Sequence, residues 1–188
     1  MDGICGHSRD EFLEMARRFH GYPAPGLIVG GFMVDLALGA LPKGILFDAI
    51  AESTACLPDA IQMLTPCTAG NGWLKVVDVG RFAICLYDKH GGEGVRVFVE
   101  PSRLEPWPEM RAWLLKLKTK SEQDERTLVD QIFDAGSRPY GVQRVRLPEA
   151  FRKKRSKGPI ALCPSCKEPY PQLAGAACKA CQGESPYD

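Results

Sequence analysis

The sequence lacks both a long apolar stretch and an export signal. No stretch of its 188 residues is long and apolar enough to cross a bilayer. The N-terminus has no apolar run behind a basic start, which a secretion signal would need. Eight cysteines without such a signal indicate a reducing cytoplasm, where paired cysteines usually bind metal. We therefore expect a cytoplasmic protein with no membrane partner.

The chain also lacks an excess of charge of either sign, since 24 Lys and Arg residues accompany 23 Asp and Glu residues. The exception is the segment 144–158, where seven basic residues accompany the single acid Glu149. Such a segment could bind nucleic-acid phosphates, but a solvated tether is the favoured interpretation. The residues that follow show no evident base-reading helix and no aromatic series for stacking, so nucleic acid is the less favoured partner.

No internal repeat is evident, and no Gly-x-Gly pattern lies between a strand and a helix, as a nucleotide cradle would require. A length of 188 residues allows one domain of roughly 150 residues plus a small module. We predict a core domain over residues 1–150, a basic linker over 151–160 and a zinc-finger module over 161–188.

The predicted helices lie on both sides of a group of predicted strands. Ser8 and Glu11 form a capping box before a helix that ends near Gly21. Residues 26–41 predict a second helix, in which small residues such as Gly30 and Gly39 let another backbone approach. A short helix begins at Pro58, and two amphipathic helices follow over 109–118 and 122–135, the latter capped by Ser121.

The strands are predicted from β-branched and aromatic residues. A short apolar run over 43–51 is the first, and an antiparallel meander follows over 73–77, 81–87 and 95–100. Because helices, strands and helices follow one another in blocks, we predict an α+β fold, an antiparallel sheet packed with helices, rather than repeated βαβ units.

Four cysteines in the C-terminal module carry the strongest chemical signal. They form two Cys-x-x-Cys pairs separated by eleven residues, namely Cys163, Cys166, Cys178 and Cys181. This spacing is typical of a four-thiolate zinc site, because soft sulfur ligands favour tetrahedral zinc. Four thiolates close the coordination shell, so we predict a structural zinc in a treble-clef or ribbon-like finger. Disulfides or free thiols are the weaker alternative.

Among the other cysteines, Cys85 lies in an apolar strand and is predicted to be buried and inert. Cys56 and Cys67 instead bracket the helix that begins at Pro58. Cys56 precedes the helix N-terminus, where a thiol is more easily ionised. Residues 67–72 form a loop of small residues whose free backbone amides could approach a ligand.

The distance between the two thiols limits a shared metal site. If most of the eleven residues from Cys56 to Cys67 are helical, the thiols lie roughly 15 Å apart. A second subunit, a shorter helix or separate roles would then be needed. Asp59 is a better neighbour for Cys56, since residues three apart share a helix face. His20 lies at the end of a predicted helix. It could cap that helix or pack in the core, and it could equally be a metal ligand or a proton carrier.

Two segments resemble the FmdE family, which takes its name from the FmdE component of formylmethanofuran dehydrogenase. Residues 19–30 read Phe-His-Gly-Tyr-Pro-Ala-Pro-Gly-Leu-Ile-Val-Gly, similar to the family's Phe-His-Gly-His-x-Cys-Pro-Gly-Leu-x-x-Gly. Residues 52–74 resemble its second motif, in which a Cys precedes Asp-Ala-Ile-Gln and Thr-Gly-Cys-Thr-x-Gly-Lys-Gly-Asn-Leu. Residues 78–81, Asp-Val-Gly-Arg, match the family's Asp-x-Gly-Lys. The resemblance covers about residues 10–100, and some members carry a similar C-terminal zinc module.

The resemblance implies an α+β core that often dimerises, with a cleft that gathers His20, Cys56, Asp59 and Cys67. His20, Cys56 and Cys67 would be the ligands of a core metal. It also implies association with molybdenum- or tungsten-dependent formylmethanofuran chemistry, the first step of methanogenesis, and hence an oxidoreductase context. The sequence departs from the family where Tyr22 replaces a His, Ala24 replaces a Cys and Asn71 replaces a Lys. The first two changes remove an imidazole and a thiolate, which are good transition-metal ligands.

Two functional hypotheses follow. In the first, the core cleft binds a metal or small ligand, with Cys56 or Cys67 as ligand or nucleophile and His20 as ligand or general base. In the second, the core is a non-catalytic homodimeric platform, and the zinc module with its basic linker docks a protein or nucleic acid.

Overall fold

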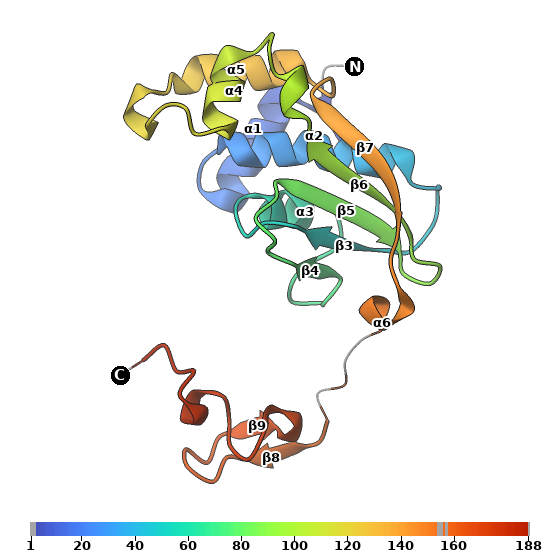
Figure 1. The fold of residues 1–188 in the computed structure, drawn as a ribbon, viewed down its shortest axis with the longest axis vertical. Coiled ribbons are helices and arrows are strands. Elements are labelled where there is room, and N and C mark those ends of the chain that lie inside the picture. The colour runs from blue at the N-terminus through green and yellow to red at the C-terminus, as the bar shows by residue number, and fades with distance from the viewer. Residues whose placement is uncertain (1–2, 154–155, 157, 188) are drawn as a thin grey trace. The chain divides into compact units, whose positions relative to one another are not determined.

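The computed structural model describes residues 3–153, 156 and 158–187. Contacts divide the chain into two compact units, Met1–Arg152 and Lys153–Asp188 (Figure 1). The first unit combines helices with a five-stranded sheet, and the second holds the four C-terminal cysteines in a small hairpin module. The fold is therefore α+β with an added zinc finger, as predicted.

The sheet of the first unit has the strand order β4-β3-β5-β6-β7. Helix α2 packs against β5 and β6 on one face of this sheet (Figure 1). The core between them is aliphatic and fully buried, with Leu27 and Ile28 from α2 and Leu86 and Val95 from the sheet. The strands are β3 (Phe47–Ala51), β4 (Leu74–Val76), β5 (Ala83–Asp88), β6 (Glu93–Val99) and β7 (Tyr140–Arg146).

The other elements surround this sheet or belong to the second unit. Two very short strands, β1 (Gly3–Ile4) and β2 (His7–Ser8), pair with each other before α1. The helices are α1 (Arg9–His20), α2 (Pro25–Ala40), α3 (Leu57–Leu64), α4 (Pro108–Leu114), α5 (Glu125–Ala135) and α6 (Glu149–Arg152). The second unit contains β8 (Ile160–Leu162) and β9 (Pro169–Pro171).

The first two helices follow the sequence signals closely. Ser8 and Glu11 form both hydrogen bonds of the capping box of α1, and Gly21 ends that helix with a φ of 89°. The α2 helix is buried over residues 26–34, where its small and apolar residues face the core, and is more exposed toward its C-terminal end. Among the described residues, no single helix is long and apolar enough to cross a membrane, although α1 and α2 together, bent by 117°, have the length and composition.

The predicted meander is wrong in its first pairing. Strand β4 runs parallel to β3 and does not pair with β5, so β3, α3 and β4 form one βαβ unit. The reason lies in the loop after β4, where the amides of Val79 and Arg81 donate to the carbonyl of Glu52 instead of forming a hairpin turn. Strands β5, β6 and β7 are antiparallel neighbours.

Strand β7 lies in a segment that the sequence did not identify as a strand. Its last four residues include Arg144 and Arg146, which belong to the basic segment 144–158 that the sequence indicated to be a solvated tether. Basic residues are common on an edge strand, because they discourage pairing with other chains. One cap prediction also needs correction. Asp124, not Ser121, caps α5 by accepting from the Thr127 amide, and Ser121 lies in a 3-10 turn (Lys120–Glu122) capped by Thr119.

The glycines of α2 make a matched pair for a stability test. A Cβ atom on Gly30 would lie 2.7 Å from the Cβ of Ala60 in α3, whereas a Cβ on Gly39 would meet nothing within 4 Å. The predicted close approach is therefore real at Gly30 and wrong at Gly39. We expect Gly30→Ala to destabilise the core by about 1–3 kcal/mol. Gly39→Ala should stabilise it by about 0.5–1 kcal/mol through helix propensity. Urea unfolding of both variants measures the difference, and equal effects would contradict the tight α2–α3 packing.

Candidate functional site

The four C-terminal cysteines form a metal-binding cluster. Their sulfur atoms all lie within 4.8 Å of one another, and the Sγ atoms of Cys166 and Cys178 are 3.7 Å apart. A tetrahedral zinc with Zn–S bonds of about 2.3 Å requires sulfur separations of about 3.8 Å. The donor set therefore fits zinc with a complete four-thiolate shell, and the site is structural.

Local backbone geometry places both pairs. The turn between β8 and β9 carries Cys163 and Cys166, and it closes through the Lys167 amide, which donates to the Cys163 carbonyl. Lys167 adopts the left-handed conformation that this turn requires, with a φ of 66°. The second pair surrounds the start of a 3-10 turn (Ala180–Gln182), whose Gln182 amide donates to the Cys178 carbonyl.

Backbone amides also prepare the buried Cys163 sulfur for metal binding. The Cys178 amide lies 3.5 Å from this sulfur. Amide hydrogen bonds from Cys178 and then Cys166 lower the pKa of Cys163 to about 6. A thiolate stabilised in this way is the form that binds zinc.

In the core domain, the structure brings His20 and Asp59 together. The Nδ1 atom of His20, at the end of α1, lies 2.7 Å from an Asp59 carboxylate oxygen in the first turn of α3. Because an ionised carboxylate only accepts, Nδ1 is the donor in this hydrogen bond. The imidazole is thereby fixed in orientation. Its ring centroid lies 5.8 Å from that of Tyr22.

Cys56 occupies the N-cap position of α3 in an unusual backbone conformation. Its φ of 56° is in the left-handed region, which is uncommon for a residue with a Cβ atom. A Cβ on Gly26 would lie 2.8 Å from the Cys56 sulfur, so only glycine fits there. The two sequence motifs therefore meet at this point, where Gly26 of the first motif leaves space for the thiol of the second.

The prediction that Cys56 ionises easily is wrong. Burial raises the pKa of its thiol, and the nearby Asp59 carboxylate raises it further, while Lys116 lowers it. Proximity to a helix N-terminus does not overcome these effects here, because α3 is only about two turns long and Asp59 places a negative charge beside the thiol.

Two cavities share part of their lining, and Cys56 lines one of them. The inner one, of about 280 Å³, is lined by Cys56, Ala24, Gly26 and Phe82 among others. The outer one, of about 570 Å³, extends toward residues 118–125. Both are lined by Tyr22, Pro25, Trp113 and Lys116. We treat them as one cleft and call it the Cys56 cleft.

Sequence reasoning missed the far wall of this cleft. Trp113 and Lys116 come from the C-terminal end of α4, more than fifty residues from Cys56 along the chain. The segment showed only an amphipathic helical pattern, which says nothing about which cavity its end faces. By contrast, Tyr22 and Ala24, the two departures in the first motif, both line the cleft.

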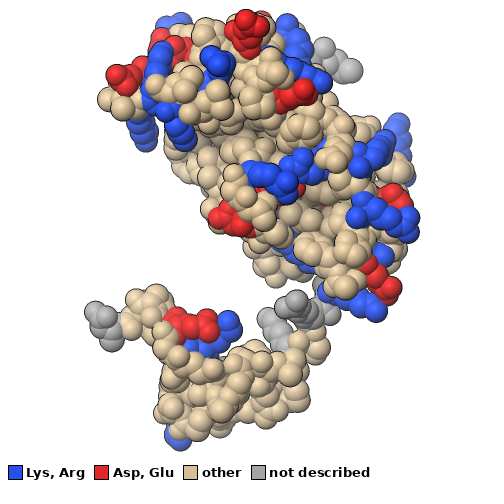
Figure 2. Space-filling model, viewed as in Figure 1, with Lys and Arg blue, Asp and Glu red and all other residues tan. Residues whose placement is uncertain are grey.

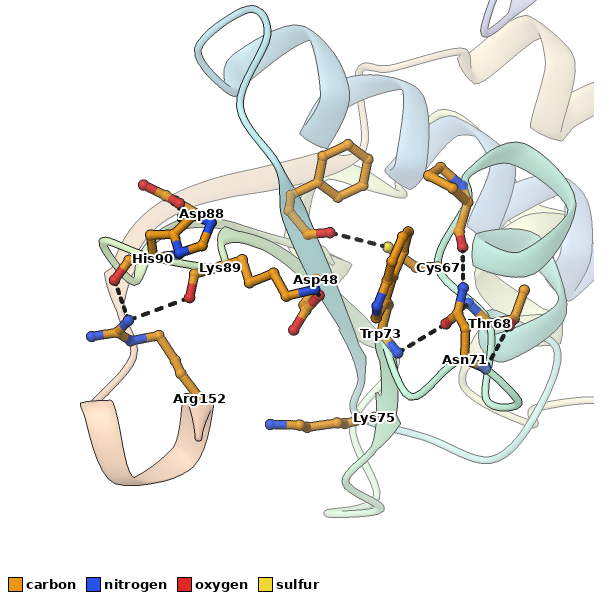
Figure 3. A network of polar contacts seen from close by, with 12 residues as sticks. Asp48, Cys67, Thr68, Asn71, Trp73, Lys75, Asp88, Lys89, His90 and Arg152 are labelled. Carbon is orange, nitrogen blue, oxygen red and sulfur yellow. Dashed lines mark hydrogen bonds and ion pairs between the residues drawn. The ribbon is translucent and has the colours of Figure 1, made fainter. Parts of the chain in front are cut away.

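Cys67 lies apart from the cleft lining. Its side chain is fully buried, and its sulfur contacts the Phe47 carbonyl of β3 at 3.5 Å (Figure 3). Burial raises the pKa of Cys67 to about 11. Figure 3 also shows the Lys89 side chain reaching toward Asp48 and Trp73, and its Nζ lies 3.6 Å from an Asp48 carboxylate oxygen and 4.5 Å from the centroid of the Trp73 ring. Cys67 is therefore surrounded by residues of the sheet, near its β4 edge.

Most backbone amides of the loop after Cys67 have hydrogen-bond partners, contrary to the sequence prediction. The Asn71 side-chain oxygen accepts from the amides of Thr68 and Trp73 (Figure 3). The Gln62 side chain accepts from the Ala69 amide, and the Thr68 hydroxyl accepts from the Asn71 amide. The loop is thus stabilised internally, and these donors are occupied.

A core metal gains no support from this geometry. Within residues 3–153, 156 and 158–187, the only group of three or more ligand atoms close enough to share an ion is the C-terminal cysteine cluster. His20 and Asp59 form a hydrogen-bonded pair, and Cys56 lies near Asp59. Cys67 instead contacts strand β3. The His20–Asp59 pair and the Cys56 thiol lie near one cleft, but they do not form a coordination site.

Comparisons with known proteins agree with the sequence resemblance. A family model described as FmdE, molybdenum formylmethanofuran dehydrogenase operon, matches residues 19–145. A second model, the FmdE treble clef zinc finger, matches residues 154–188. The chain is also similar to a crystal structure of a tungsten formylmethanofuran dehydrogenase FmdE-like protein from Syntrophus aciditrophicus. The two share 52% identity and a TM-score of 0.92, with 99% of this chain and 98% of that chain covered.

A curated relative carries a different description. A probable S-adenosyl-L-methionine-binding protein of Archaeoglobus fulgidus is 31% identical over 105 residues. The match covers 50% of this chain and only 28% of the relative. The shared part is therefore a fraction of that longer protein.

Proposed function

The chain belongs to the FmdE family, and from this premise we propose that its core domain binds a small organic ligand in the Cys56 cleft. The observation that supports this most strongly is the conformation of Cys56. A left-handed backbone at a residue with a Cβ costs about 1 kcal/mol or more, and such strain tends to cluster at functional sites. Here it places a thiol in the lining of a cavity of about 280 Å³.

The departures from the family pattern favour an organic ligand over a metal. Ala24 offers no ligand atom and is buried against the cleft. Tyr22 offers a phenol, whose pKa is raised by burial and by the nearby Cys56 and Glu125, so it remains a neutral hydrogen-bonding group. Together with Trp113 and Phe82 these residues form a largely apolar lining with few polar groups, which is typical of small-molecule sites.

His20 and Asp59 act in this proposal as a positioning pair. The Asp59 carboxylate holds the His20 ring, whose centroid lies 5.8 Å from that of Tyr22, and Tyr22 lines the cleft. If the ligand undergoes chemistry, Cys56 is the available nucleophile and His20 the available base. The zinc finger, with its closed thiolate shell, takes no part in that chemistry.

The cellular context that we propose follows the family. The protein would act in the cytoplasm, since four of its cysteines are grouped to bind zinc and none of those described is in a disulfide, which suits a reducing compartment. It would act as a homodimer and in association with molybdenum- or tungsten-dependent formylmethanofuran chemistry. Docking of nucleic acid by the basic segment receives little support, because Arg146 pairs with Glu93 and Arg152 donates to the carbonyls of Lys89 and His90 (Figure 3).

Protection of Cys56 from alkylation tests the proposed function. The rate of iodoacetamide modification at Cys56, followed by peptide mass spectrometry, should fall about tenfold when the cleft is occupied. The probes are formylmethanofuran and S-adenosyl-L-methionine, which the names of the relatives suggest. Modification of Cys5, which does not line the cleft, is the internal control. Trp113→Ala should remove the protection, because it deletes a shared wall of both cavities.

Metal analysis distinguishes the alternative for the same site. We expect one zinc per chain in the wild type and in Cys56→Ser, because the described thiols outside the finger form no coordination group. A second metal equivalent that disappears in Cys56→Ser, together with no protection by either probe, would show that the cleft is a metal site instead.

A further inference from the structure

The outer part of the Cys56 cleft is rich in lysine. Lys116, Lys118 and Lys120 line it, against the single carboxylate of Glu125. Lys118 is already paired with Glu109, outside the cleft lining. In the described part of the chain, neither Lys116 nor Lys120 forms an ion pair, and both are exposed. Basic side chains are visible over the α4–α5 end of the core domain in Figure 2.

Lys116 is held toward the cleft by a strained backbone. It follows the C-terminal end of α4 with a φ of 55°, a conformation that helices usually assign to glycine at this position. The cost of a left-handed residue with a Cβ is about 1–2 kcal/mol. Its amide donates to the Trp113 carbonyl, and its Nζ lies 5.9 Å from the centroid of the Trp113 ring.

Two strained residues therefore line one cavity. Only Cys5, Cys56, Lys116 and Lys167 combine a side chain with a positive φ in the described residues. Lys167 belongs to the zinc turn, whereas Cys56 and Lys116 both line the inner cavity, from the ends of α3 and α4 respectively. The strained backbone at Lys116 and at Cys56 therefore places a cation and a thiol in the lining of the same cavity.

We propose that the ligand of the Cys56 cleft is a small organic anion with a flat apolar body. Lys116 and Lys120 bind its carboxylate or phosphate group, and its body lies along Tyr22 and Trp113, with one end near the Cys56 sulfur. The inference rests on the proposed function and deepens it by naming the chemical class of the ligand. Lysine is a point charge that binds either group, and aromatic walls accept a flat body.

The charge preference of the site can be measured at Cys56 itself. Iodoacetate is an anion and iodoacetamide is its neutral analogue, so the ratio of their reaction rates at Cys56 reports attraction of anions, separately from thiol reactivity. We expect Lys116→Gly to lower this ratio about fivefold, and Lys116→Arg to keep it. Glycine is chosen because it adopts the positive φ without strain. Lys43→Met, which removes an exposed lysine that does not line the cleft, is the matched control and should leave the ratio unchanged.

Competing ligands provide the second readout. Benzoate and phenyl phosphate should slow iodoacetamide modification of Cys56 at concentrations where benzamide does not, and added salt should weaken this effect. The benzoate and phenyl phosphate arms distinguish a carboxylate from a phosphate ligand.

The two proposals fail in different ways. An unchanged rate ratio in Lys116→Gly, or equal protection by benzoate and benzamide, would overturn the anion assignment and leave the cleft as a ligand site. Absence of protection by every probe, including formylmethanofuran and S-adenosyl-L-methionine, would overturn the cleft as a ligand site altogether.

Discussion

Removal of zinc is expected to unfold the C-terminal module and to leave the core domain folded. Among the described residues of the second unit, only Cys163 and Tyr170 are buried hydrophobic side chains. Ile160, Leu162 and Leu173 are between 60% and 71% exposed, so this unit has almost no core of its own. The binding energy of a structural zinc, roughly 10–16 kcal/mol in zinc-finger peptides, then supplies most of its folding free energy.

Cys163→Ser is the sharpest version of this experiment. Cys163 is the buried ligand and accepts backbone hydrogen bonds, so its loss removes both a zinc bond and the centre of the module. Zinc content should fall from one per chain to near zero, and limited proteolysis should cut within residues 160–187. Cys56→Ser is the matched control and should keep the zinc and the protease resistance. A protease-resistant module after chelation would contradict a zinc-dependent fold.

The same samples test which unit of the chain would hold the proposed homodimer together. If the module holds two copies of the chain together, chelation should convert dimers into monomers in sedimentation experiments. If the dimer forms through the core domain, chelation should leave it intact.

The zinc site could be predicted from the sequence because its geometry is local. Each Cys-x-x-Cys pair lies within one turn, and the β8–β9 hairpin joins residues that are close along the chain, such as Leu162 and Pro169. Spacing therefore determines most of the coordination geometry. The capping box of α1 was predictable for the same reason, since Ser8 and Glu11 are three residues apart.

The Cys56 cleft could be predicted only in part. The motifs identified His20, Tyr22 and Cys56, but the opposite wall depends on where the end of α4 packs, which is a tertiary property. The left-handed backbone of Cys56 also leaves no mark in the sequence, where a glycine would be the usual signal. Cys67 is the opposite case. It belongs to a motif, but its side chain is buried against β3 and does not line the Cys56 cleft.

A buried ion pair on the sheet is expected to produce the second large effect. Glu52, directly after β3, accepts two hydrogen bonds from the Arg96 guanidinium of β6, at 2.6 and 2.9 Å. Arg81 approaches the same carboxylate at 2.8 Å. The side chains of Glu52 and Arg96 are only 10% and 16% exposed. The backbone of Glu52 also fixes the loop after β4 by accepting from Val79 and Arg81.

Arg96→Met should therefore destabilise the core by about 2–4 kcal/mol. Removing one partner of a buried pair usually costs about 3–5 kcal/mol, because the remaining charge is left poorly solvated. Arg81 stays beside Glu52 and reduces that cost. Arg146→Met, which breaks the exposed pair with Glu93 on the neighbouring strand, is the control and should cost no more than about 1 kcal/mol.

The pH dependence of this difference identifies its origin. Hydrogen bonds from Arg96, and then its charge and that of Arg81, hold the pKa of Glu52 below its ordinary value of 4.5. A carboxyl whose pKa is lowered by folding stabilises the native state above its unfolded pKa, and this stabilisation is lost as the pH falls through the folded pKa. The wild type should therefore lose more unfolding free energy than Arg96→Met below about pH 4.5.

Glu11, Glu122 and Asp124 also have lowered pKa values, but they contribute equally to both proteins and cancel in the difference. Urea unfolding from pH 7 to pH 3 measures this, and a difference that stays constant across that range would show that Arg96 stabilises the sheet by packing on Phe98 rather than through Glu52.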